Sequence, residues 1–129
     1  MLVVLDTSVL IDFLRGRPVV ERVRALRVTG RVAATTAVNV DELARGRRPG
    51  EGEAIRGLLS GLVLIEIDHD AAWLAGTWRR DAAATGRTLW QADCLIGAAS
   101  QRRGATLATG NPKDFALPGL QVEHWPVGV

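Results

Sequence analysis

The stretch Leu2-Val3-Val4-Leu5-Asp6-Thr7-Ser8 decides the fold of this chain. Its four apolar residues, two of them β-branched, are typical of a strand that is buried on both faces. The apolar run stops at the carboxylate of Asp6, and Thr7 and Ser8 can cap a short helix that continues to Leu14. Ligands of α/β sheets bind outside the carboxyl ends of the strands. The stretch therefore predicts that Asp6 lies at a functional site.

Strands and helical segments alternate along the rest of the chain. Four further strands are expected, at residues 32–35, 62–67, 105–108 and 120–124. The expected helices cover residues 19–28, 36–45, 54–59, 71–85 and 91–103, with one helical turn at 112–115. This alternation favours an α/β fold with a parallel sheet covered on both faces and right-handed crossovers. A length of 129 residues predicts a single domain, residues 1–129.

The composition is that of a globular protein, with 47% hydrophobic and 23% charged residues. No apolar run approaches the roughly 20 residues of a membrane span, and the chain starts with a strand instead of a signal peptide. The single cysteine, Cys94, excludes an internal disulfide, and its apolar surroundings in the sequence predict a buried thiol. These features predict a cytoplasmic protein with no membrane partner.

The net charge is only +2, but the arginines are unevenly distributed. A basic surface near an acidic pocket would suit a ligand with a phosphate backbone. The alternative is that arginine is simply the solvating residue of this chain, because Lys113 is the one lysine among 16 basic residues. The arginines singled out as candidate ligand contacts are Arg15, Arg17, Arg45, Arg47 and Arg48.

Four acids can converge at the carboxyl edge of the predicted sheet: Asp6, Glu42, Asp93 and Asp114. Glu42 lies in a predicted helix in which the adjacent Asp41 must point about 100° away, so only one of the two can face the strand ends. Asp93 begins a helix of apolar and small residues, where it is an N-cap, a ligand or both. Asp114 follows the polar loop 109–113, in which a glycine allows close backbone approach.

The four acids have a shared chemical rationale. Carboxylates within a few ångströms repel each other unless they are protonated or neutralised by a cation. A ligand set made only of oxygens suits Mg²⁺ or Mn²⁺ better than Zn²⁺, and His69 and His124 are isolated in the sequence. Such ions can activate water and stabilise the charge on a phosphodiester under attack. The chain has no phosphate-binding P-loop and no dinucleotide fingerprint.

Four stretches carry a resemblance to a known family: residues 4–12, 42–46, 92–99 and 109–115. In this order, they resemble the PIN-domain ribonucleases, specifically the VapC-type toxins of type II toxin–antitoxin systems. The resemblance spans nearly the whole chain and implies a three-layer α/β/α sandwich with a mainly parallel sheet. It further implies a Mg²⁺- or Mn²⁺-dependent endoribonuclease that acts on RNA, forms a homodimer and is neutralised by a cognate antitoxin protein.

The resemblance also implies roles for individual residues. It makes Asp6 and Asp93 direct metal ligands, whereas Glu42 binds the metal or orients a metal-bound water. For Asp114 it leaves two roles open, direct metal binding or action through water, and the equivalent acid often acts through water. The polar residues that would hydrogen-bond the carboxylates or the substrate are Ser8 and Asn111.

Two other functions compete with this interpretation. A receiver-like Mg²⁺-binding signalling domain is also α/β, and Asp68 at the end of the third predicted strand could be its phosphate acceptor. However, Asp6 has no acidic neighbour, and Glu42 and Asp93 would have no role in such a domain. The third alternative is a catalytically inactive PIN fold that serves as an RNA- or protein-binding module.

A few residues outside the acidic set are expected to be structural or solvated. Asp12, one and a half turns into the first helix, is expected to be solvated. Trp73 is expected to pack in the core or in a dimer, and Trp78 and Trp90 are weaker candidates for stacking on RNA bases.

Overall fold

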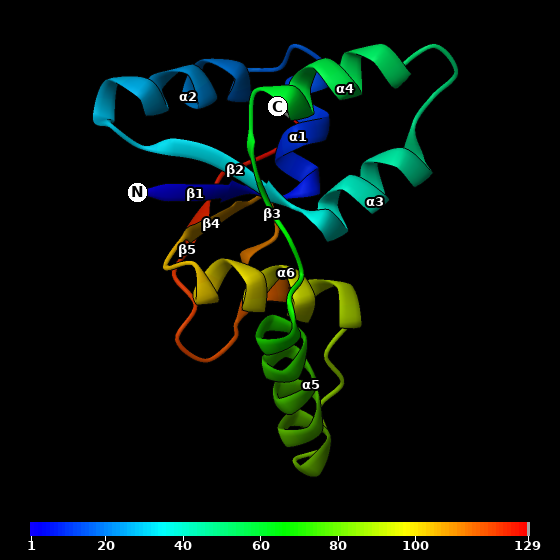
Figure 1. Cartoon of the computed structure of the whole chain (residues 1–129), viewed down its shortest axis with the longest axis vertical. Coiled ribbons are helices and arrows are strands. Elements are labelled where there is room, and N and C mark those ends of the chain that lie inside the picture. The colour runs from blue at the N-terminus through cyan, green and yellow to red at the C-terminus, as the bar shows by residue number, and fades with distance from the viewer. Residues whose placement is uncertain (129) are drawn as a thin grey trace.

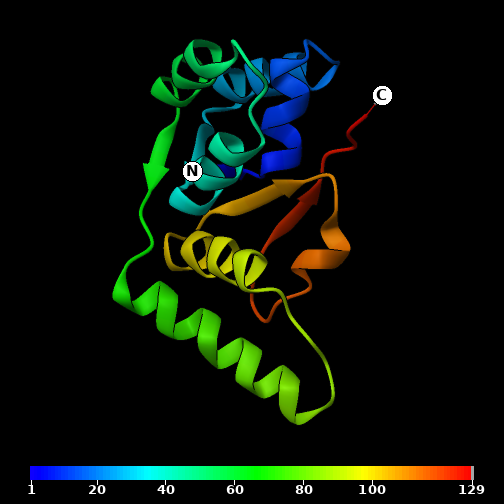
Figure 2. The same cartoon turned by 90° about the vertical axis from the view of Figure 1, so that its right-hand side faces the viewer.

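The computed structural model describes residues 1–128 (Figures 1 and 2). Within them the chain forms five strands: β1 (Leu2–Leu5), β2 (Val32–Thr36), β3 (Val63–Ile65), β4 (Thr106–Thr109) and β5 (Val122–His124). The same residues form six α-helices: α1 (Thr7–Leu14), α2 (Val19–Ala25), α3 (Ala37–Gly46), α4 (Gly52–Ser60), α5 (His69–Ala84) and α6 (Gln91–Arg102). Two single turns of 3₁₀ helix complete the structure: η1 (Leu26–Thr29) and η2 (Pro112–Phe115).

The five strands form one parallel sheet in the order β3-β2-β1-β4-β5. β1 lies at its centre, where Val4 is in register with Ala34 of β2 and Leu107 of β4. From β1 the chain moves outward through β2 and β3, and later returns to the other side of β1 for β4 and β5. The strand order therefore reverses at β1, which is where open α/β sheets bind their ligands.

Helices cover both faces of the sheet. In Figure 2, α5 and α6 lie on one side, and α1, α2 and α4 lie on the other. Successive side chains of β1 point to opposite faces of the sheet, so this strand contributes to a hydrophobic core on each face. Val4 packs in the core that contains Trp78 and Ile96. Val3 and Leu5 pack in the core on the opposite face. This arrangement confirms the predicted α/β/α sandwich with a parallel sheet.

The elements differ from the sequence-based predictions mainly at their ends. The helix expected over 19–28 is α2 followed by the 3₁₀ turn η1. The strand expected over 62–67 pairs only along β3, because β3 is an edge strand and the chain then leaves the sheet to start α5. Asp68 is the N-cap of α5 and accepts a hydrogen bond from the Ala71 backbone N–H at 2.8 Å.

Three expectations about side chains were wrong or only partly right. Asp12 is buried, with 3% of its surface exposed, instead of solvated. Trp73 is 74% exposed, which excludes the core as its location. Trp78 is buried in the core under α6 and cannot stack on RNA, whereas Trp90 is exposed. The buried thiol of Cys94 was predicted.

In the part of the chain that the structure describes, none of the helices has the length and apolar character needed to cross a membrane.

Candidate active site

Asp6 is held at the carboxyl end of β1 by both its backbone and its side chain. Its backbone N–H donates to the Ala108 carbonyl of β4 at 3.0 Å. Its carboxylate, in a residue only 7% exposed, accepts hydrogen bonds from Thr109 Oγ1 at 2.8 Å and from Asn39 Nδ2 at 3.3 Å. Asp6 occupies the N-cap position of α1, but its side chain accepts no capping hydrogen bond from that helix. Burial raises the pKa of the Asp6 carboxyl, although these hydrogen bonds oppose the rise.

Glu42 is fixed by a network that starts where β2 ends. Thr36 and Asn39 form a reciprocal capping box at the start of α3. The Asn39 amide then donates to Thr7 Oγ1 at 3.0 Å, and Thr7 Oγ1 donates to Glu42 Oε1 at 2.7 Å. Glu42 is half-buried while the neighbouring Asp41 is exposed, so Glu42 is the acid of this pair that faces the site.

Asp93 lies in the first turn of α6, two residues after the helix begins, and it is not the N-cap. Burial, together with the nearby charges of Asp114, Asp6 and Glu42, raises the pKa of Asp93 to about 6. Asp114 itself is exposed on η2. Since one carboxyl feels the other three charges, the fold brings all four predicted acids to one end of the sheet.

The loop that follows β4 lies directly against the start of α1. The Gly110 backbone N–H donates to Ser8 Oγ at 3.2 Å, and Ser8 Oγ in turn lies 3.5 Å from the Asp6 carboxylate. The backbone N–H of Asn111 donates to Thr109 Oγ1 at 3.0 Å, while its own side chain is exposed. Ser8 therefore lies beside the acids, whereas Asn111 reaches them through its backbone and Thr109.

The site carries only oxygen ligands suited to a hard cation. Among the described residues, no three acidic, histidine or cysteine side chains stand close enough together to hold an ion jointly. Mg²⁺ commonly binds through one or two carboxylates and keeps several of its waters. Repulsion from the three other acids contributes to the raised pKa of Asp93, and a divalent cation would relieve this repulsion. The donor set therefore fits Mg²⁺ or Mn²⁺.

The candidate basic residues fall into two groups. Arg15 pairs with Glu51 at 2.5 Å, and Arg17 pairs with Asp12 at 2.6 Å. The three arginines at the end of α3 and just after it are exposed and form no ion pair with any residue in 1–128: Arg45, Arg47 and Arg48.

Sequence reasoning missed three polar residues that shape the site: Thr7, Asn39 and Thr109. Each hydrogen-bonds a predicted acid directly, Thr7 to Glu42 and the other two to Asp6. Two sequence signals for these supporting residues were available. One is a threonine at the end of a strand next to the site, and the other is an asparagine three residues after the N-cap Thr36. Neither signal identifies a partner, because each partner lies more than 30 residues away in the chain.

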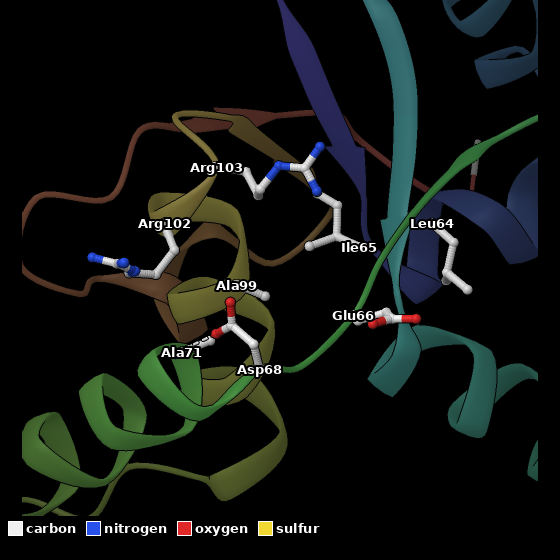
Figure 3. A pocket seen from close by; sticks show the side chains of 8 residues that line it. All are labelled: Leu64, Ile65, Glu66, Asp68, Ala71, Ala99, Arg102 and Arg103. Carbon is white, nitrogen blue, oxygen red and sulfur yellow. Dashed lines mark hydrogen bonds between the residues drawn. The ribbon is translucent and has the colours of Figure 1, made fainter.

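Two hollows lie away from the four acids. The smaller one, of about 320 Å³, is bounded by β3, α5 and α6. Figure 3 shows Glu66 and Asp68 on one segment of its wall and Arg102 and Arg103 on another. Asp68 already caps α5, and Arg102 pairs with Asp70 at 3.3 Å. The larger hollow is an apolar groove of about 1080 Å³ between α1, α2, η1, β2 and α4.

The family of the chain follows from its fold, its acids and a direct comparison with family models. The PIN domain family model matches residues 3–117, and the chain belongs to the PIN-domain family. A receiver-like domain is thereby excluded, in agreement with Asp68 serving as a helix cap on an edge strand.

Individual relatives are similar over nearly their full length. The "tRNA(fMet)-specific endonuclease VapC" of Shigella flexneri is 27% identical over 127 residues, which cover 94% of this chain and 96% of the relative. The "Ribonuclease VapC19" of Mycobacterium tuberculosis is 30% identical over 120 residues, covering 91% and 95%. The solved structure of DNA-bound VapBC from Salmonella typhimurium has a TM-score of 0.82 at 26% identity, covering 97% of this chain and 99% of the solved chain.

Proposed function

We propose that this protein is a metal-dependent endoribonuclease that acts as the toxin of a toxin–antitoxin pair in the cytoplasm. The main support for the proposal is that four acids from four separate segments lie near one another. The charges of Asp114, Asp6 and Glu42 contribute to the raised pKa of Asp93. Relatives named as VapC ribonucleases and endonucleases support the reaction, and the VapBC complex among the similar structures supports the partner.

Asp6 and Asp93 are the residues that would hold Mg²⁺ or Mn²⁺. When bound, the ion supplies positive charge that activates water and stabilises the charge developing on the phosphodiester. Glu42, whose carboxylate accepts a hydrogen bond from Thr7, would bind the ion or orient the attacking water and accept its proton. Asp114, on the exposed side of the site, acts through water.

The test is cleavage of structured RNA by the purified protein with and without divalent metal. We expect cleavage with Mg²⁺ or Mn²⁺, none in excess EDTA, and recovery when Mg²⁺ is added back, because the four carboxylates need a cation to act together. Undiminished cleavage after full chelation would contradict the metal-dependent mechanism. Metal-independent RNA binding without any cleavage would instead support the inactive binding module.

The exposed arginines at the end of α3 are proposed to bind the RNA backbone. We expect Arg45→Ala and the Arg47→Ala/Arg48→Ala double variant to flatten the salt dependence of RNA binding by ~0.7 in log–log slope for each phosphate that is no longer neutralised. Arg15→Ala is the comparison, because Arg15 is already paired with Glu51 and should change the slope less. The measurement is a salt titration in EDTA, which prevents cleavage. Equal slopes in all variants would leave these arginines as solvating residues only.

A cognate antitoxin is proposed to occupy the apolar groove between α1, α2, η1, β2 and α4 and to place an arginine or lysine among the acids. The groove suits the apolar face of an amphipathic helix, and the lining residues Arg24 and Arg27 favour acidic flanks on that helix. A cationic side chain among the carboxylates replaces the charge of the metal.

This partner can be tested at the groove without touching the acids. Val32 lines the groove and is part-exposed, whereas Val28 is exposed outside it. We expect Val32→Glu to weaken inhibition by the antitoxin at least about tenfold while leaving free cleavage unchanged, because a charge in an apolar contact is costly. Val28→Glu is the control. Cleavage by the purified complex at the rate of the free protein would contradict blocking of the site.

The homodimer remains a prediction, to be checked by sedimentation.

A further inference from the structure

Residues 125–128 run along residues 109–111, which are the end of β4 and the start of the loop after it, and are fixed to them at two points. The Trp125 backbone N–H donates to the Thr109 carbonyl at 2.8 Å. Val127 packs over Gly110 so closely that a Cβ atom on Gly110 would lie 2.5 Å from Val127 Cγ2. A larger residue at position 110 would force Val127 or the loop to move, so the segment packs directly on the loop.

The far end of the same segment is fixed to α1. The Gly128 backbone N–H donates to Asp12 Oδ2 at 2.7 Å, while Asp12 Oδ1 accepts from the Arg17 guanidinium at 2.6 Å. Asp12 is almost completely buried, so its charge is compensated by these two donors. One of the donors is local, five residues away, and the other is 116 residues away.

The loop held in this way is the one that supports the acids. Thr109 donates to Asp6, and the Gly110 N–H donates to Ser8 Oγ. Asp6 directly precedes α1, and Asp12 lies in the second half of the same helix. The helix thus contacts the loop directly at one end and anchors, at Asp12, the segment that covers the loop.

We propose that Asp12 is a positioning residue for the candidate active site: by holding residues 125–128 across the loop 109–111, it fixes the groups that orient Asp6 and Ser8. The kinetic part of this inference rests on the proposed ribonuclease function. Asp12 does not touch the substrate or the metal, and its effect reaches the acids only through the segment and the loop.

The first test compares Asp12→Asn with Asp81→Asn, the same change at an exposed acid of α5, by amide hydrogen exchange and by RNA cleavage. Asp12→Asn keeps the size of the side chain but loses the charged acceptor for Gly128, so we expect about tenfold faster exchange at the amides of Gly110 and Gly128. We expect kcat to fall about tenfold with KM unchanged, because the acids are misplaced but the RNA-binding residues are kept. Asp81→Asn leaves the bond between Asp12 and Gly128 intact and should match wild type in both measurements.

The second test changes two residues that pack against each other, Gly110 and Val127, and does not depend on the stability of α1. Gly110→Ala should lower kcat about tenfold, because the new methyl group displaces Val127 or the loop. Adding Val127→Ala removes the two methyl groups in its way, so the double variant should recover the kcat of Val127→Ala alone.

Three results would overturn the proposal: wild-type exchange and kcat in Asp12→Asn, equal losses in Asp12→Asn and Asp81→Asn, or simple additivity in the Gly110–Val127 pair. The exchange measurement needs no RNA. If the wild-type protein does not cleave RNA, the proposed function fails, and loop exchange in Asp12→Asn and Asp81→Asn still decides whether Asp12 holds the loop.

Discussion

Replacing Asp6 by asparagine is expected to reduce RNA cleavage on the order of a thousandfold and to leave the metal-free protein at least as stable as wild type at neutral pH. The loss of activity follows from removing the central carboxylate of the site, whose position is set by Thr109 and Asn39. The stability follows from burial, which raises the pKa of Asp6 and so makes its charged form unfavourable in the fold. Function and stability are thus in conflict at this residue.

The measurement is a cleavage time course together with melting temperatures in EDTA and with Mg²⁺. Metal should raise the melting temperature of wild type by mass action and that of Asp6→Asn much less. Asp41→Asn is a matched control, because Asp41 is an exposed acid beside Glu42 and its replacement should change neither quantity. A marked drop in the melting temperature of Asp6→Asn in EDTA, with equal stabilisation of both proteins by metal, would mean that Asp6 is structural and that no metal site exists here.

The contribution of Asp93 to the stability of the metal-free protein should fall as the pH rises from about 4 to about 7. The pKa of Asp93 is raised from 3.8 to about 6 by burial and by the three other acids. The folded state therefore holds this proton more tightly than the unfolded state. Its stabilising contribution is complete below the unfolded pKa and is lost as the pH rises through about 6.

Asp93→Asn isolates this contribution. After allowance for solvent screening of a part-exposed group, we expect the variant to be about 1 to 2 kcal/mol more stable than wild type above pH 7, or roughly 4 to 8 °C in melting temperature. Below pH 4 the two proteins should melt together. The measurement is thermal unfolding in EDTA from pH 3.5 to 8. A wild-type protein that gains stability relative to Asp93→Asn as the pH rises would contradict the like-charge cluster.

The sequence was sufficient for the sheet and for the convergence of the acids, because both depend on local patterns. The continuous apolar run of β1 predicts a central parallel strand, and a residue that ends such a strand must lie at the carboxyl edge of the sheet. Glu42 could be separated from Asp41 by helix geometry alone. The structure brings together the four acids that this reasoning selected.

The supporting contacts could not be predicted, because they join residues that only the folded chain makes neighbours. Asp12 looked solvated on an isolated helix, yet its partner Gly128 lies 116 residues away. Arg15 looked available for a ligand, yet Glu51, 36 residues away, binds it. Periodicity indicates which face of an element is buried, but it does not indicate which polar atom will meet which donor.

The central place of β1 also constrains when this protein can become active. The first acid, Asp6, leaves the ribosome early, but β1 is completed on its second side only by β4, about one hundred residues later. Until β4 is inserted, Asp6 lacks Thr109, and Asp114 has not yet been synthesised. A nascent chain is therefore inactive through most of its translation. This leaves an interval in which a partner already present in the cell can bind the chain as it folds.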